Sequence, residues 1–473
     1  AGGRLLEFDT SIDWLSRDSS LKASFPLTVS NFRATYNQGL GTVERGNNDP
    51  KKYEVPSHQW IDLTDKSGNY GVSIIEDGKY GSDKPNDDTL RLTLLYTPNT
   101  DSGSWGNNAT QDWGHHDFIY AVYGHFGDFR QGQSQWQALR LNQPLVAFES
   151  PRHEGIHGRS FSLVRTDSHQ IAVTAIKKAE ESDHIVFRFQ ELWGKGASQV
   201  KISLPSGIAQ AFETDAQERK TGEVSFSGRD MYLDFTKYSP KTVAVRLARP
   251  DRNLSKPSSV PLHLEYDSSL VSSDSNRSAP GFESPGGGTL PAEKLPGEIT
   301  SEGIRFHMGP REDWTPGAVS CKGQIVKIPD GGFTHVYILA AADEDTKGVF
   351  MVDRVPYELG VQKWYGSVGN WDRRIFTKKW AVGSLEPGFI KRDTIAWFSS
   401  HRHTGGRNDS YIFSYLFKYE IRIPEGARSL TLPQNSKIRI FAISAASDLN
   451  SLTKAASSLY DNFDGRKIVQ PSG

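Results

Sequence analysis

The chain has 473 residues and a formal net charge of −1, with 36% hydrophobic and 23% charged residues. A charge this close to neutral provides no overall field that would hold nucleic acid or an anionic membrane, so we expect neither as a partner. No apolar run approaches the roughly 20 residues of a membrane-spanning helix, and the single cysteine, Cys321, excludes an intrachain disulfide framework. The chain starts at Ala1 rather than Met, which indicates a trimmed N-terminus, and we expect a bacterial periplasmic or secreted location.

Alternating apolar and polar residues predict strands throughout the first half of the chain. This period of two occurs at residues 5–10, 90–95 and 185–190, and turn-forming Gly, Pro and Asn residues separate the runs. The polar segment 131–144 is predicted to be a short helix or a loop. The pattern indicates an all-β region that continues to about residue 249 and that we assign, with its surroundings, to one domain over 1–265.

The segment 266–298 is rich in Ser, Pro and Gly, which is typical of a linker, and we place a domain boundary there. Residues 299–473 again contain strand patterns and are predicted to form a second, jelly-roll-like β-sandwich. Aromatic and aliphatic residues occupy both faces of segment 411–421, so this strand should be buried on both sides. Residues 446–460 have the apolar spacing of a short C-terminal helix.

A series of motifs in the first half resembles a known family. In order, they are Glu44-Arg45, the E-V-P-x-x-x-W-x-D-L segment at 54–63, KYG at 79–81, LRLTLL at 90–95, D-x-G-x-H-x-F-x-Y-x-x-x-x-H at 112–125, R-x-x-E-x-x-G at 188–194 and K-T-x-x-V-x-L at 241–247. Together they resemble the C-terminal β-region of glycoside hydrolase family 38, the retaining α-mannosidases. The sequence departs from the family at residues 46–48, where Pro-Thr usually follows the E-R pair.

The resemblance implies a fold and a function for the chain. It implies a large antiparallel super-sandwich of the galactose-mutarotase type in the first domain, belonging to the non-catalytic part of an enzyme that acts on α-mannose-containing glycans. The family's zinc ion and Asp nucleophile belong to an N-terminal domain with a PH-x-D-x-G-W motif, which these 473 residues do not contain. We therefore expect the catalytic domain as a partner, no cofactor in this chain and no hydrolysis by it alone.

Two other classes of function remain open. The same scaffold could serve a free-standing carbohydrate-binding or surface adhesion protein, and a lyase-type β-domain is a third interpretation that the family motifs disfavour. The reading frame upstream of residue 1 distinguishes the first two, because an enzyme would carry the PH-x-D-x-G-W motif there and a binding protein would carry an export signal.

Candidate sugar-binding residues lie in the second predicted domain. Aromatic rings stack on the faces of sugar rings, and nearby polar groups form hydrogen bonds with the sugar hydroxyls. Suitable side chains occur in the loop at 364–374 and in the histidine pair at 401 and 403. These candidates are Trp364, Trp371, Asp372, Arg373, His401 and His403. The alternatives are that the tryptophans are core residues and that the histidines are hydrogen-bonded loop residues.

The sequence predicts no metal site, although two places have suitable side chains. His115 and Asp117 would share one face of a strand, but two ligands fall short of the three that a catalytic zinc needs, so a hydrogen-bonding role is the alternative. The acidic turn at 80–88 could hold calcium or could simply be solvated.

Overall fold

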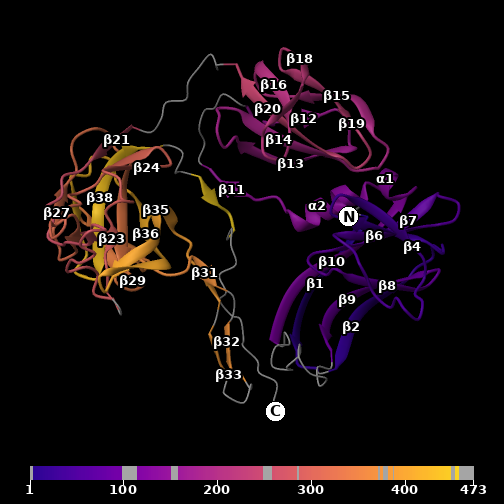
Figure 1. Cartoon of the computed structure of the whole chain (residues 1–473), viewed down its shortest axis with the longest axis horizontal. Coiled ribbons are helices and arrows are strands. Elements are labelled where there is room, and N and C mark those ends of the chain that lie inside the picture. The colour runs from indigo at the N-terminus through magenta and orange to yellow at the C-terminus, as the bar shows by residue number, and fades with distance from the viewer. Residues whose placement is uncertain are drawn as a thin grey trace.

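The computed structural model describes residues 4–16, 18–98, 114–150, 158–248, 258–284, 287–370, 373–376, 382–386, 388–448 and 453–457. The all-β fold class is confirmed, since strands dominate the described residues and two short helices accompany them (Figure 1). Every sheet in this part of the chain is antiparallel except one short parallel pair, β22 with β23. Neither helix has the length and apolar character needed to cross a membrane.

The first sandwich is built from the N-terminal strands. One sheet contains, in spatial order, β1 (Leu5–Trp14), β10 (Gly114–Phe126), β7 (Tyr70–Glu76), β6 (Trp60–Thr64), β3 (Ala34–Gln38) and β4 (Gly41–Arg45). The other contains β2 (Ser19–Pro26), β9 (Thr89–Thr97), β8 (Gly81–Asn86) and β5 (Val55–Pro56). Ile61 and Ile74 of the first sheet pack with Leu90 and Leu92 of the second in one buried cluster.

Two helices pack on the outer face of the larger sheet of this sandwich. α1 (Phe129–Gly132) begins at Asp128, whose carboxylate accepts from the backbone N–H groups of Arg130 and Gln131, and α2 (Ser134–Asn142) follows directly. The predicted helix-or-loop segment is therefore largely helical. Ala138 of α2 packs with Trp60 in a small separate core.

The second sandwich follows the helices. One sheet contains β12 (Arg165–Thr166), β15 (Ala197–Ser203), β19 (Asp230–Phe235) and β18 (Ser225–Ser227). The other contains β13 (Ile171–Lys178), β14 (Ile185–Glu191), β20 (Pro240–Leu247), β16 (Ile208–Thr214) and β17 (Lys220–Glu223). Its core, which includes Phe187, Phe189 and Met231, is separate from that of the first sandwich. The region predicted to be one super-sandwich therefore contains two cores.

The motif R-x-x-E-x-x-G has a structural explanation in this second sandwich. The buried Glu191 carboxylate accepts backbone N–H groups from Trp193, Gly194 and Tyr238, each at 2.8 Å. Gly194 has a φ of +68°, and a Cβ there would lie 2.3 Å from the Tyr238 ring, so glycine is required. The Tyr238 hydroxyl in turn lies 2.6 Å from the Thr42 hydroxyl of the first sandwich. The motif therefore fixes the contact between the two sandwiches.

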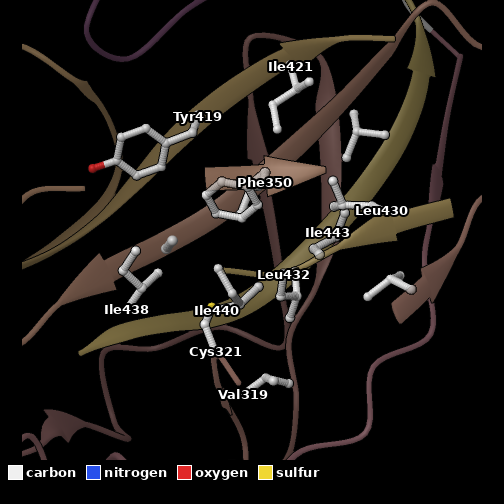
Figure 2. Close-up of a cluster of buried hydrophobic side chains, with 14 of the residues drawn as sticks. Val319, Cys321, Phe350, Tyr419, Ile421, Leu430, Leu432, Ile438, Ile440 and Ile443 are labelled. Carbon is white, nitrogen blue, oxygen red and sulfur yellow. The ribbon is translucent and has the colours of Figure 1, made fainter. Parts of the chain in front are cut away.

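The third sandwich contains residues from 258 onward. One sheet contains β21 (Ser258–Pro261), β38 (Ile438–Ser447), β28 (His335–Ala342), β36 (Arg407–Arg422) and β35 (Thr394–Thr404), with β26 (Val319–Ser320) beside β38. The facing sheet contains β27 (Ile325–Lys327), β37 (Ser429–Thr431), β29 (Thr346–Val352) and β30 (Val355–Val361). Figure 2 shows the core between them, where Phe350 and Leu430 of the second sheet meet Ile440 and Tyr419 of the first.

The larger sheet of the third sandwich is covered on its other face as well. Leu270, Phe282, Leu290 and Leu295, all from the segment predicted to be a linker, pack in a second core against this sheet. A linker over 266–298 is thus not what the structure shows. The segment instead completes the burial of the sheet, and residues 414–419 of β36 are buried on both faces, as predicted for this strand.

Short two-stranded ladders complete the fold. They are β22 (Val271–Ser272) with β23 (Leu290–Pro291), β24 (Glu298–Ser301) with β25 (Ile304–His307), β31 (Gly369–Asn370) with β34 (Phe389–Ile390), β32 (Arg373–Phe376) with β33 (Val382–Glu386), and β11 (Phe148–Glu149) with β39 (Lys454–Ala455). The predicted C-terminal helix is wrong for the described part of residues 446–460, which ends β38 and forms β39.

Candidate functional site

A cavity of about 440 Å³ lies where the first sandwich, helix α2 and the second sandwich meet. It is lined by Asn37, Gly39, His58, Gln59, Tyr80, Gln135, Leu139 and Gln190. Four of these side chains are amides, which can both donate and accept hydrogen bonds, and two are aromatic rings. The lining comes from β3 and the turn after it, the turn before β6, the turn before β8, α2 and β14, so the fold assembles it from five segments.

Three of the four amide side chains of the cavity are held in place by one another. Gln135 Oε1 accepts from the Asn37 amide at 3.0 Å and from the Trp60 indole N–H at 2.8 Å. The Gln135 amide donates to Gln59 Oε1 at 2.9 Å. Gln59 has a φ of +39°, a left-handed conformation that is uncommon outside glycine. The network holds this strained residue at the cavity wall.

His58 and Tyr80 form the aromatic edge of the cavity. Their ring centroids are 5.7 Å apart, and both side chains are exposed, Tyr80 by 59%. His58 comes from the E-V-P-x-x-x-W segment and Tyr80 from KYG, so two separate sequence motifs meet here. An exposed ring beside fixed amides can stack on a sugar ring and hold its hydroxyls.

A buried polar network beneath the helices contains a Ser, a His and an Asp but is not an accessible site. Asp62 Oδ2 lies 2.7 Å from His125 Nε2 and accepts from the Ser73 hydroxyl at 2.8 Å. The side chains of His125 and Asp62 are 0% and 1% exposed. No substrate can reach these atoms, and the network ties strands β6, β7 and β10 together.

Trp364, one of the predicted sugar contacts, is a core residue. It is 0% exposed, its ring stacks on Phe282 at 4.2 Å with 6° between the planes, and its indole N–H donates to Ser284. The guanidinium of Arg402 lies 5.7 Å from the ring. A buried ring cannot stack on a glycan, so the core alternative describes Trp364.

The other members of the predicted loop are not brought together with Trp364 in what is described. Trp371 and Asp372 lie outside the described residues, and Arg373 begins β32 without a described side chain. A sugar contact at these three positions therefore stays a prediction.

His401 and His403 lie close together on β35, with ring centroids 5.5 Å apart. Asp274, from the segment predicted to be a linker, joins them, and Nε2 of His403 is 3.2 Å from Asp274 Oδ1. Burial lowers the pKa of His403, and the Asp274 charge opposes this effect. Within the described residues this is the cluster whose donor atoms are placed to hold a metal ion.

His115 and Asp117, the other predicted metal candidates, form an exposed ion-pair network with Asp13. His115 Nδ1 is 2.8 Å from Asp13 Oδ1, and Nε2 is 3.1 Å from Asp117 Oδ1. The hydrogen bond to Asp13 raises the pKa of His115 against the effect of burial, and the Asp117 charge adds to it. An imidazole that contacts two carboxylates fits the hydrogen-bonding alternative.

Asp83 of the acidic turn is engaged by cations of the protein itself. Its carboxylate is 1% exposed and lies 2.7 Å from Lys22 Nζ and 2.6 Å from Arg91 Nε. Both carboxylate oxygens of Asp83 therefore form ion pairs, one with Lys22 on β2 and one with Arg91 on β9. These ion pairs link the strands, which is a structural role.

Comparison with known families matches three segments of the chain. The model described as "Glycosyl hydrolases family 38 C-terminal domain" matches residues 1–104, and "Glycosyl hydrolases family 38 C-terminal beta sandwich domain" matches residues 170–247. The third, "AziU2-like beta-sandwich domain", matches residues 257–449. The first two matches confirm the resemblance drawn from the motifs. The third begins before the segment predicted to be a linker and spans it.

Two individual proteins that the chain matches are named α-mannosidases. Alpha-mannosidase 2C1 of Mus musculus is 28% identical over 254 residues, which is 52% of this chain and 23% of the mouse protein. Alpha-mannosidase 2C1 of Homo sapiens is 30% identical over 244 residues, 50% of this chain and 22% of the human protein. The match thus spans less than a quarter of each relative. A solved family 38 structure from Enterococcus faecalis has a TM-score of 0.44 and 20% identity, covering 52% of this chain and 28% of that chain.

Sequence reasoning missed the cavity residues and Asp274. His58 and Tyr80 lie inside two of the family motifs, and this position could have identified them as candidate site residues. No feature of the sequence points to Gln135 or Gln190. Asp274 lies in a Ser-rich segment whose composition suggested a linker.

Proposed function

We propose that the chain is the C-terminal, non-catalytic part of an α-mannosidase, because residues 1–104 and 170–247 match the models of family 38 C-terminal domains. In this proposal it supports the active-site cleft of the enzyme, and the cavity between the first two sandwiches contributes to the binding of an α-mannose-containing glycan. The observation that carries the proposal is the match of both domains together with relatives that are themselves named α-mannosidases.

The cavity gives this role a chemical basis. A mannoside offers hydroxyl groups that need both donors and acceptors, and the amides of Asn37, Gln59 and Gln135 provide both within one wall. Because these amides already bond to one another, they are preorganised and lose little side-chain entropy when a ligand binds. The exposed Tyr80 ring offers a face for the apolar side of a sugar.

The experiment uses the complete protein encoded by the reading frame that contains these residues. Hydrolysis of p-nitrophenyl α-mannoside and of an α-linked mannobiose is measured for the parent and for His58→Ala and Tyr80→Ala. We expect each variant to raise KM about tenfold, the effect of losing roughly 1.4 kcal/mol of binding. Tyr96→Ala is the matched control, because Tyr96 is an exposed tyrosine (62%) on β9 and does not line the cavity.

The outcomes separate the two parts of the proposal. A complete protein without α-mannosidase activity would refute the assignment. Active protein with unchanged KM in both cavity variants would refute the role of the cavity alone. A reading frame that encodes an export signal followed directly by these residues would favour the free-standing carbohydrate-binding protein.

A further inference from the structure

Three side chains that commonly bind metals converge at the edge of the third sandwich, away from the cavity. His401 and His403 lie on β35, and Asp274 lies in the turn after β22. Donor atoms from the three lie within 4.8 Å of one another. We propose that Asp274, His401 and His403 bind a divalent transition-metal ion, with zinc the best fit.

The strongest indication is a buried nitrogen atom that lacks a partner. Nε2 of His401 is buried and makes no hydrogen bond within the described part of the chain, and Nε2 of His403, also buried, faces the Asp274 carboxylate at 3.2 Å. A buried polar atom without a partner costs free energy that a folded protein normally avoids. A cation between the two rings would be bound by both nitrogen lone pairs and would remove that cost.

Surrounding residues orient His403 for this role. Its Nδ1 lies 3.0 Å from the Ser272 hydroxyl, which lies 2.5 Å from the Thr289 hydroxyl. Backbone hydrogen bonds of 2.9 and 3.0 Å between Thr289 and His403 fix the strand at the same point. If Nδ1–H donates to Ser272, the lone pair of Nε2 faces Asp274, which is the tautomer that a metal ion requires.

Asp274 is also held in place. Its backbone N–H donates to Glu293, and Asp313 accepts from the backbone N–H and the hydroxyl of Ser273, both at 2.7 Å. Arg277 lies 3.3 Å from Asp274 Oδ1, so this carboxylate already has one cationic neighbour. The alternative is therefore that Asp274 forms ion pairs with Arg277 and His403 and that no metal ion binds. Zinc binding by the metal-free chain distinguishes these two interpretations.

The donor set favours zinc. Two imidazoles and one carboxylate form a common catalytic zinc set, with a fourth position open to solvent. Tetrahedral zinc with bonds of about 2.0–2.1 Å places its ligand atoms roughly 3.3 Å apart, close to the 3.2 Å between Asp274 and His403. The Asp274 side chain is 46% exposed, so an ion can enter from solvent.

The test is zinc titration of the metal-free chain by isothermal calorimetry, with bound metal checked by mass spectrometry. The parent should bind one zinc ion per chain. His401→Ala and Asp274→Ala should each weaken binding at least tenfold, and Ser272→Ala should weaken it tenfold to a hundredfold through its effect on His403. His403 is left unchanged, because its ring is fully buried and its loss would disturb folding.

His307→Ala is the matched control, since His307 forms a 2.8 Å pair with Glu298 in the same sandwich but has no second histidine. Thermal unfolding confirms that each variant is folded. Absence of stoichiometric zinc binding by the parent would overturn the proposal. So would binding that is equally strong in His401→Ala, Asp274→Ala and His307→Ala, because the ion would then be bound elsewhere.

Discussion

Glu76 should make the stability of the first sandwich depend on pH. The side chain is 0% exposed, Oε1 has no hydrogen-bond partner among the described residues, and Oε2 accepts only from the Lys79 backbone N–H at 2.7 Å. Burial raises the pKa of Glu76 from 4.5 to about 8. The folded state therefore holds a proton that the unfolded state releases, and stability falls as pH rises from about 4.5 to 8.

The magnitude follows from the two pKa values. At about 1.4 kcal/mol per pH unit the full difference corresponds to about 5 kcal/mol, and local rearrangement that hydrates the ionised carboxylate should reduce this to about 2–3 kcal/mol. Glu76→Gln keeps the shape and stays neutral. We therefore expect it to match the wild type near pH 5 and to exceed it in unfolding free energy at pH 8.

Pulse proteolysis in urea at pH 5, 6, 7 and 8 measures this, with mass spectrometry following peptides from residues 70–97. Glu44→Gln, the same change at an exposed position on β4 of the same sandwich, is the control and should leave the pH dependence unchanged. Parallel pH curves for the wild type and Glu76→Gln would refute the reasoning, because Glu76 would then titrate alike in the folded and unfolded states.

Two further predictions concern the third sandwich. Trp364→Ala should lower its unfolding free energy by about 3–5 kcal/mol through a core cavity, and Trp364→Phe should cost less; a change below about 1 kcal/mol in urea unfolding would contradict the buried position. Burial raises the pKa of Cys321 to about 12, so native protein should resist iodoacetamide at pH 8 while urea-unfolded protein reacts; equal rates in the two states would show that the thiol is exposed.

The sequence was a good guide wherever burial follows a local pattern. The alternation at 90–95 predicted β9, and the mixed apolar faces of 411–421 predicted that β36 is covered on both sides. What covers its second face could not be predicted. Leu270, Phe282 and Leu290 are isolated apolar residues in a Ser- and Pro-rich segment, and such spacing gives no period to recognise.

The candidate sites were harder to predict because they depend on long-range contacts. Trp364, next to Tyr365, was predicted to stack on a sugar ring. Its indole is buried against Phe282, which comes from a distant segment of the chain. His401 and His403 were recognised as a pair from their spacing. Asp274, which makes the pair a possible metal site, reaches them only through the packing of the segment between β22 and β23.

Hydrolysis of p-nitrophenyl α-mannoside tests the central claim most directly. The assay compares the complete protein with the chain of residues 1–473. The account predicts turnover by the complete protein and none by the chain alone, because the family's nucleophile and zinc motif do not occur in these residues. Turnover by the chain alone, or its absence in the complete protein, would contradict the account.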